Sequence, residues 1–112
     1  HLHGIMLTIS GEHGPQYVRS TDVLYIEVQN HSLIYHTQYS DLTATGTLKR
    51  VENQLAEEGF FRCNYCYLVN LRHVDFLDGN TVMVGGHPLQ ISRNRRKDFL
   101  QQMTGFYGKG GR

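Results

Sequence analysis

The sequence predicts a mainly β domain, and three observations lead to this fold class. Short segments rich in β-branched and aromatic residues recur at intervals of about ten residues along much of the chain. Residues that favour turns, chiefly Gly, Asn, Asp and Pro, separate these segments. Only two stretches show the spacing of apolar residues that is typical of an amphipathic helix.

Seven segments have the composition of strands, and several of them alternate apolar and polar residues as a half-buried strand does. They are Ile5–Ile9, Gln16–Ser20, Val23–Gln29, Ser32–Gln38, His73–Asp78, Thr81–Gly85 and Pro88–Ser92. Turns are expected between them, at residues 11–15, Asn30–His31, residues 78–80 and Gly85–Gly86.

The first helix is expected over residues 47–58, where apolar residues recur at i, i+3 and i+7. Thr47 is the expected N-cap, because its hydroxyl can accept a hydrogen bond from a free N–H of the first turn. Gly59 is the expected C′ residue, because glycine readily adopts the left-handed conformation that ends many helices.

The second helix is expected to be short and to follow Ser92, its expected N-cap. Phe99, Leu100 and Met103 would form its apolar face. The helix lies near the C-terminal end of the chain, so the sequence predicts one amphipathic helix within the β domain and a short helix at its end.

The chain of 112 residues is long enough for one domain with a single core. We expect that core to span about residues 4–104 and the glycine-rich residues 105–112 to form a flexible tail. No apolar run reaches the roughly 20 residues that a membrane span needs, and the N-terminus lacks the pattern of a signal peptide. A cytoplasmic protein is therefore expected, and the start at His1 rather than at Met suggests a piece of a longer protein.

Charge is distributed unevenly along the chain. Up to Ser92 there are five basic and nine acidic residues, whereas the remainder has six basic residues and only Asp98. Four of these basic residues lie within 93–97, in the first turns of the second helix, where positive charge opposes the helix dipole at a cost of a few tenths of a kcal/mol each. A docked phosphate would reverse that cost, so this segment indicates nucleic acid binding. A solvated helix face is the alternative.

Cys63 and Cys66 form a C-x-x-C pair. A structural zinc site needs four ligands, and the downstream His73 and His87 do not have the spacing of a zinc finger. A redox pair of the thioredoxin type lies at the start of a helix in a βαβ unit, which this sequence lacks. We therefore expect two reduced, half-buried cysteines, no metal and no cofactor; a zinc site that gathers these four residues is the more remote alternative.

The sequence contains no P-loop, no dinucleotide-binding glycine motif and no nucleophile elbow. The paired carboxylates Glu57 and Glu58 fall at the end of the first helix, where exposure to solvent is the ordinary outcome. Enzymatic activity is therefore not expected.

Four blocks of the sequence together resemble the LytTR DNA-binding domain, found at the C-terminal end of many bacterial response regulators. The blocks are DVLYIEVQNHSLIYHT (22–37), GTLKRVENQL (46–55), FFRCNYCYLVNLRHV (60–74) and LQISRNRRKDF (89–99). The resemblance implies an elongated arrangement of about ten strands in small sheets, in agreement with the spacing of the strand segments. It also implies binding to duplex DNA through loops between strands that enter successive major grooves. On this basis residues 62–67 form a DNA-facing loop, with Leu68, Val69 and Leu71 as the apolar anchor beneath it.

By the same resemblance, three places in the chain read bases. His31 lies in a turn between two strands, and its ring nitrogens can donate to or accept from a base edge. Arg93 follows the last strand and suits a bidentate contact with guanine. At the middle position many members have a histidine followed by an arginine or asparagine, whereas this chain has Asn64 and Tyr65, either of which can make the contact. Cys66 stands where serine is common.

The resemblance assigns contacts with the DNA backbone to residues that fix the register without reading the sequence: Asn30, Arg62, Asn94, Arg96 and Lys97. The expected partner is double-stranded DNA, with paired copies on direct repeats in promoters. Pairing would come from an N-terminal receiver domain, so that this chain is the output domain of a two-component response regulator. The alternative is a β-rich protein-interaction module that uses the basic C-terminal helix.

Overall fold

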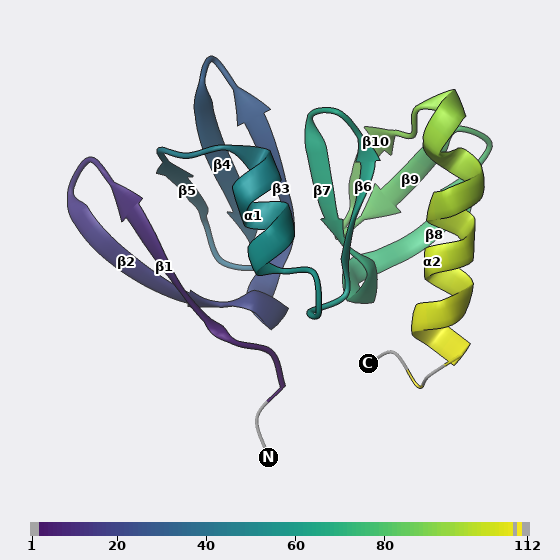
Figure 1. Cartoon of the computed structure of the whole chain (residues 1–112), viewed down its shortest axis with the longest axis horizontal. Coiled ribbons are helices and arrows are strands. Elements are labelled where there is room, and N and C mark those ends of the chain that lie inside the picture. Colours follow the sequence, from purple (N-terminus) through teal and green to yellow (C-terminus); the bar gives the residue numbers. More distant parts are fainter. Residues whose placement is uncertain (1–2, 109, 111–112) are drawn as a thin grey trace.

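The structure is a computed structural model that describes residues 3–108 and residue 110. Within these residues ten strands form three antiparallel sheets, which confirms the mainly β prediction (Figure 1). The two-stranded sheet contains β1 (Met6–Gly11) and β2 (Gly14–Arg19). The three-stranded sheet has the order β10–β9–β8, with β8 at Val74–Asp78, β9 at Thr81–Val84 and β10 at His87–Gln90.

The five-stranded sheet lies between the other two and has the order β5–β4–β3–β7–β6 (Figure 1). Its strands are β3 (Val23–Gln29), β4 (Ser32–Thr37), β5 (Asp41–Ala44), β6 (Phe60–Asn64) and β7 (Tyr67–Asn70). The helices are α1 (Leu48–Gln54) and α2 (Arg96–Gly108), with short 3-10 turns at Ser20–Asp22, Leu71–His73 and Arg93–Arg95. The described part of the chain has no helix of the length and apolar character that would let it cross a membrane.

All seven segments that the sequence predicts as strands are strands, but three further strands were missed. β5 is short and begins with an aspartate, so it carries a weak strand signal. β6 and β7 replace most of the loop predicted over residues 62–67, leaving only Tyr65 and Cys66 in a turn. The loop prediction was too wide because the N–H groups of Cys66 and Tyr67 donate hydrogen bonds to the Asn64 side chain and close the turn tightly.

Two hydrophobic clusters lie on opposite faces of the five-stranded sheet. Neighbouring residues of one strand point to opposite faces, and Ile26 belongs to one cluster while Tyr25 belongs to the other. The first cluster includes residues of β1, β2 and α1, and the second includes residues of the three-stranded sheet and α2. Figure 1 shows these elements on either side of β3 and β7.

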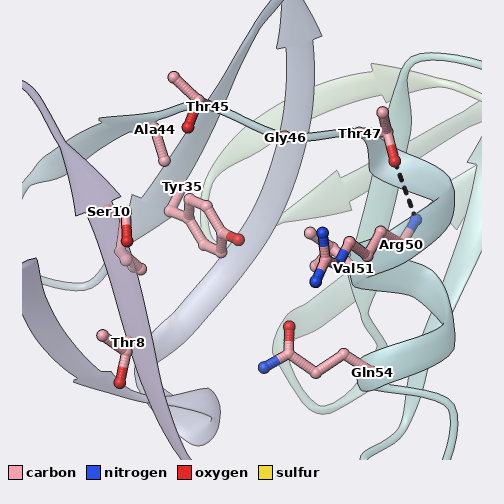
Figure 2. Close-up of a pocket in the computed structure, with 11 residues that line it drawn as sticks. Thr8, Ser10, Tyr35, Ala44, Thr45, Gly46, Thr47, Arg50, Val51 and Gln54 are labelled. Carbon is pink, nitrogen blue, oxygen red and sulfur yellow. Dashed lines mark hydrogen bonds between the residues drawn. The ribbon is translucent and has the colours of Figure 1, made fainter.

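Helix α1 begins as the sequence predicts and ends earlier. The Thr47 hydroxyl accepts a hydrogen bond from the Arg50 N–H at 3.2 Å, which confirms the predicted N-cap (Figure 2). The helix ends at Gln54 rather than at residue 58, because the next backbone bonds join residues three apart and form tighter turns. Gly59, with φ of +79°, therefore follows these turns and is not the C′ residue of α1.

The predicted N-cap of the second helix is wrong. Ser92 makes no capping bond; its hydroxyl instead donates to the Cys63 carbonyl at 3.1 Å, so the chain continues through the 3-10 turn Arg93–Arg95 before α2 begins. The side chain that would cap the helix thus ties the helix start to β6.

Helix α2 is longer than the short helix predicted, and it includes residues 105–108 of the predicted flexible tail. Phe106 packs against the second cluster, and the Tyr107 hydroxyl donates to the Leu71 carbonyl at 3.0 Å. These contacts make residues 105–108 part of the fold. Of the remaining residues of the predicted tail, only Gly110 lies within the described residues.

Replacing Phe99 should test how α2 is anchored, because this side chain is fully buried in the second cluster. We expect Phe99→Ala to lower the free energy of unfolding by about 3–5 kcal/mol, measured by urea titration. Leu100→Ala, on the same helix at a partly exposed position, is the control and should cost clearly less. Equal losses would contradict the orientation of α2.

Candidate nucleic-acid interface

The three places predicted to read bases lie along one edge of the molecule, at the top of Figure 1. They are the β3–β4 turn, the β6–β7 turn and the segment that joins β10 to α2. The first two are adjacent, because β3 pairs with β7 and the Val28 N–H donates to the Cys66 carbonyl at 3.0 Å. Three segments far apart in the sequence therefore form one continuous edge.

The β3–β4 turn contains only Asn30 and His31. Gln29 and Ser32 face each other across it, and the two turn residues have φ of 50° and 65°. Two left-handed residues are typical of a type I′ turn, whose twist matches that of the flanking strands. Glycine usually occupies the position of His31 in such turns, so the structure keeps an exposed imidazole at the tip of the hairpin despite the backbone strain.

The β6–β7 turn separates the roles of Asn64 and Tyr65. The Asn64 side chain is buried, and its Oδ1 accepts hydrogen bonds from the N–H groups of Cys66 (2.8 Å) and Tyr67 (3.1 Å). Its Nδ2 donates to the Gln90 carbonyl. Tyr65 is 81% exposed at the tip of the turn. Asn64 thus holds the turn from within, and Tyr65 projects from it.

The Arg62 side chain forms hydrogen bonds both to helix α1 and to the backbone of the same turn. Its Nε donates to Glu52 on α1 at 3.2 Å, and a terminal guanidinium nitrogen donates to the Tyr65 carbonyl at 2.8 Å. The Arg62 side chain is only 12% exposed. The guanidinium thus has partners within the protein, and it connects α1 to the turn that carries Tyr65.

The basic segment after β10 has a different character. Arg93, Asn94 and Lys97 are exposed, and Arg96 donates from Nε to the Gly79 carbonyl at 3.0 Å. The ion pairs among the described residues involve His36, Lys49 and Arg62, and none involves residues 93–97. The basic side chains of this segment therefore form no ion pair with a carboxylate of the described residues.

A carboxylate–histidine cluster lies on the sheet behind the edge, and the sequence reasoning missed it. The His36 ring contacts Glu27 through Nε2 at 2.6 Å and Asp41 through Nδ1 at 2.9 Å, and it stacks on Tyr25 with ring centroids 4.3 Å apart. Burial, and then the Glu27 charge, raise the pKa of Tyr25 to about 12. The two-residue turn fixes the register that brings Glu27 near His36, and this turn was the available signal.

The cysteines and histidines of the zinc alternative do not come together. Cys63 is buried with its thiol against the Gln90 carbonyl, whereas His73 bonds to the Thr21 carbonyl at 2.6 Å and His87 packs against the Tyr25 ring. Among residues 3–108 and 110, no group of three or more His, Cys, Asp or Glu is placed to hold a metal ion.

A pocket of about 580 Å³ lies away from this edge, between β1, the end of β5 and α1 (Figure 2). Its walls are mainly polar: Figure 2 shows Arg50 and Gln54 on the α1 side and Thr8 and Ser10 on the β1 side, with the buried ring of Tyr35 behind them. The residues that line it include none of those predicted to contact DNA. The pocket is therefore separate from the edge that carries the turns.

An open edge of exposed turns that ends in a basic segment defines a β domain suited to bind a polyanion. The sequence model of the LytTr DNA-binding domain matches residues 16–104. The chain therefore belongs to the LytTR family, which is a DNA-binding family rather than an enzyme family.

The fold agrees with this assignment. The chain is similar to the LytTr DNA-binding domain of a protein named as a methyl-accepting/DNA response regulator from Bacillus cereus, with a TM-score of 0.76 and 20% sequence identity. The similarity covers 88% of this chain and 95% of that one. At this identity the likeness concerns the fold alone. Comparison with curated proteins gives no match.

The thiols should react slowly with iodoacetamide in the native protein. Burial raises the pKa of Cys63 to about 12 and also raises that of Cys66, so at pH 8 both hold less of the reactive thiolate than a free cysteine does. We expect Cys63 to remain unmodified until the protein unfolds and Cys66 to react first, as measured by mass spectrometry. Denatured protein is the control, and rapid native labelling of Cys63 would contradict the packing of β6.

Proposed function

We propose that this chain binds duplex DNA sequence-specifically by inserting the turns of its exposed edge into major grooves, as the output domain of a cytoplasmic transcription regulator of the two-component response-regulator type. The arrangement of the edge carries the proposal: two tight turns and a basic segment lie along it (Figure 1), and each has an exposed side chain. A relative of similar fold is named as part of a response regulator.

His31, Tyr65 and Arg93 are the proposed base readers. All three side chains are exposed, and Arg93 suits a bidentate contact with guanine. Tyr65 is preferred over Asn64 at the middle position because the Asn64 oxygen and nitrogen both bond within the protein. A phenol can donate to or accept from a base edge and can also pack against a thymine methyl group.

Backbone contacts are proposed for Asn30, Asn94, Arg96 and Lys97. Of these, Arg96 retains guanidinium N–H groups beyond the one that bonds Gly79. Arg62, also predicted from the resemblance as a phosphate contact, is better explained as a support of the Tyr65 turn, because its guanidinium is mostly buried and bonded to protein.

Two copies are proposed to act together on direct repeats in a promoter. An N-terminal receiver domain outside this chain would pair them, so the second copy would bind at the high effective concentration that the first creates. A single domain then needs only moderate affinity for its half of the site.

Selection of duplexes from a random DNA pool by the purified chain, at near-physiological salt, tests the proposed function. Enrichment of a short motif that is lost with Arg93→Ala would support sequence-specific readout. Retention without a motif would contradict base reading and leave phosphate binding alone. No retention even at low salt would favour the protein-interaction module, because phosphate contacts strengthen steeply as salt falls.

Substitutions at Arg93 and Lys97 should separate base reading from backbone contact. Arg93→Ala should cost about 1–3 kcal/mol on the selected site and relax discrimination at one base pair. Lys97→Ala should weaken binding to all duplexes and reduce the salt-dependence slope by about one unit. Fluorescence anisotropy on specific and random duplexes measures both. Equal effects of the two variants on both duplexes would contradict the division of roles.

His31→Gly should make the protein more stable while weakening DNA binding. The left-handed conformation costs a non-glycine residue about 1–2 kcal/mol, and glycine loses about 0.5–1 kcal/mol more in backbone entropy on folding. We therefore expect the free energy of unfolding to rise by up to about 1 kcal/mol, while affinity for the selected site falls.

Gln29→Gly is the control for this prediction, because Gln29 lies beside the turn without a positive φ. This variant should lose stability. A loss of stability in His31→Gly would contradict the turn geometry, and unchanged selectivity would contradict the reading role of His31.

A further inference from the structure

One buried side chain joins two of the DNA-facing elements. The side-chain oxygen of Asn64, Oδ1, accepts hydrogen bonds from the N–H groups of Cys66 and Tyr67 and so closes the turn that carries Tyr65. The other end of the same amide donates to the Gln90 carbonyl, at the end of β10. A primary amide can do both because it has acceptor and donor groups on one rigid plane.

The backbone beside Asn64 strengthens this connection. The ladder between β6 and β7 shifts register between Arg62 and Asn64, so Cys63 is left out of the regular pairing. The Cys63 carbonyl instead accepts from the Ser92 N–H at 2.9 Å and from the Ser92 hydroxyl at 3.1 Å. We call the contacts of Cys63 and Asn64 with Gln90 and Ser92 the seam. Arg93 is the next residue after Ser92, so the seam holds the backbone directly before Arg93.

The seam joins two different sheets. β6 belongs to the five-stranded sheet and β10 to the three-stranded sheet. The distance between Tyr65 and Arg93 is therefore not set by a shared ladder of backbone hydrogen bonds. The contacts of Asn64 and Cys63 with the segment from Gln90 to Ser92 connect the two sheets at this point.

We propose that Asn64 is a positioning residue for DNA recognition, which fixes the spacing between Tyr65 and Arg93 so that both reach their bases at once. The inference rests on the proposed function. Asn64 is only 7% exposed and has protein partners at both ends of its amide, so it acts through its neighbours. A preformed spacing lowers the ordering cost of specific binding and matters little for contacts with phosphates alone.

The chemistry of the amide defines the test variants. Asn64→Asp keeps the oxygen that closes the turn, but it cannot donate to Gln90 and sets a carboxylate against that carbonyl. Asn64→Ser is a neutral second variant whose shorter side chain cannot span the same gap. Ser92→Ala is the matched control, because it removes one bond to Cys63 and leaves the Asn64 bonds in place.

The first measurement needs no DNA. Amide hydrogen exchange followed by NMR should show at least tenfold faster exchange of the Ser92 N–H in both Asn64 variants, because the segment before Arg93 loses an anchor. In the Ser92→Ala control, the residue 92 N–H should change less, and the amides of β9 should be unaffected in all variants. Unchanged exchange at Ser92 in both Asn64 variants would overturn the inference by itself.

The second measurement is a double-mutant cycle on the selected duplex and a random duplex. The ratio of the two affinities cancels the general effect of the added charge in Asn64→Asp. In the native background Arg93→Ala should reduce this ratio about tenfold or more. In the Asn64→Asp background the same substitution should reduce the ratio by less than about threefold, because a displaced Arg93 no longer contacts its base. A full and equal effect in both backgrounds would overturn the positioning role.

Together, the hydrogen-exchange measurement and the double-mutant cycle distinguish failure of the inference from failure of the proposed function. No effect of Arg93→Ala in the native background would overturn the assignment of Arg93 as a base reader, and the inference with it. Unchanged exchange at Ser92, together with a normal effect of Arg93→Ala, would overturn the inference alone and leave the proposed function intact.

Discussion

The burial of β3 on both faces is the constraint on which the rest of the structure depends. Four consecutive residues, Val23 to Ile26, are buried, and they divide between the two hydrophobic clusters. A strand buried on both faces has to be covered on both sides. One side is covered by α1 and the β1–β2 hairpin, and the other by the three-stranded sheet and α2. The turns of the exposed edge extend from β3 and β7, the strands that lie between these two layers.

Hydrogen bonds and ion pairs between polar side chains then fix the turns of that edge more closely than hydrophobic packing does. A two-residue turn fixes the pairing of β3 with β4, and this register brings Glu27 to one nitrogen of His36, whereas the pairing of β4 with β5 brings Asp41 to the other. Asn64 closes the neighbouring turn from within. Each contact is directional, and those of Glu27 and Asn64 are partly buried, where a hydrogen bond left unmade is costly. The hydrophobic clusters make the fold stable, and these polar groups determine where the exposed side chains point.

Much of the fold could be predicted from the sequence, because strand and helix signals are local. The β-branched and aromatic composition of Val23–Gln29, followed by the turn residues Asn30 and His31, predicted the bounds of β3, and Thr47 identified the start of α1. The errors arise where a distant partner overrides the local signal. Ser92 is a residue type that often caps helices, but its hydroxyl donates a hydrogen bond to the carbonyl of Cys63, 29 residues away. Asn64 is a residue type common in exposed loops, but its side chain donates a hydrogen bond to the Gln90 carbonyl. Chain order alone does not reveal either partner, so the site residues could be proposed but not their separate roles.

The contact between Arg62 and Glu52 has a consequence for the ionic character of the interface. A cation that binds a phosphate releases a counterion from DNA, and this release makes affinity depend on salt. Arg62 already has Glu52 as a counterion inside the protein, so it contributes little to that release even though it lies beneath the turn. The number of ions released on binding should therefore be smaller than the number of basic residues near the edge, and the shortfall would identify the cations that serve the fold.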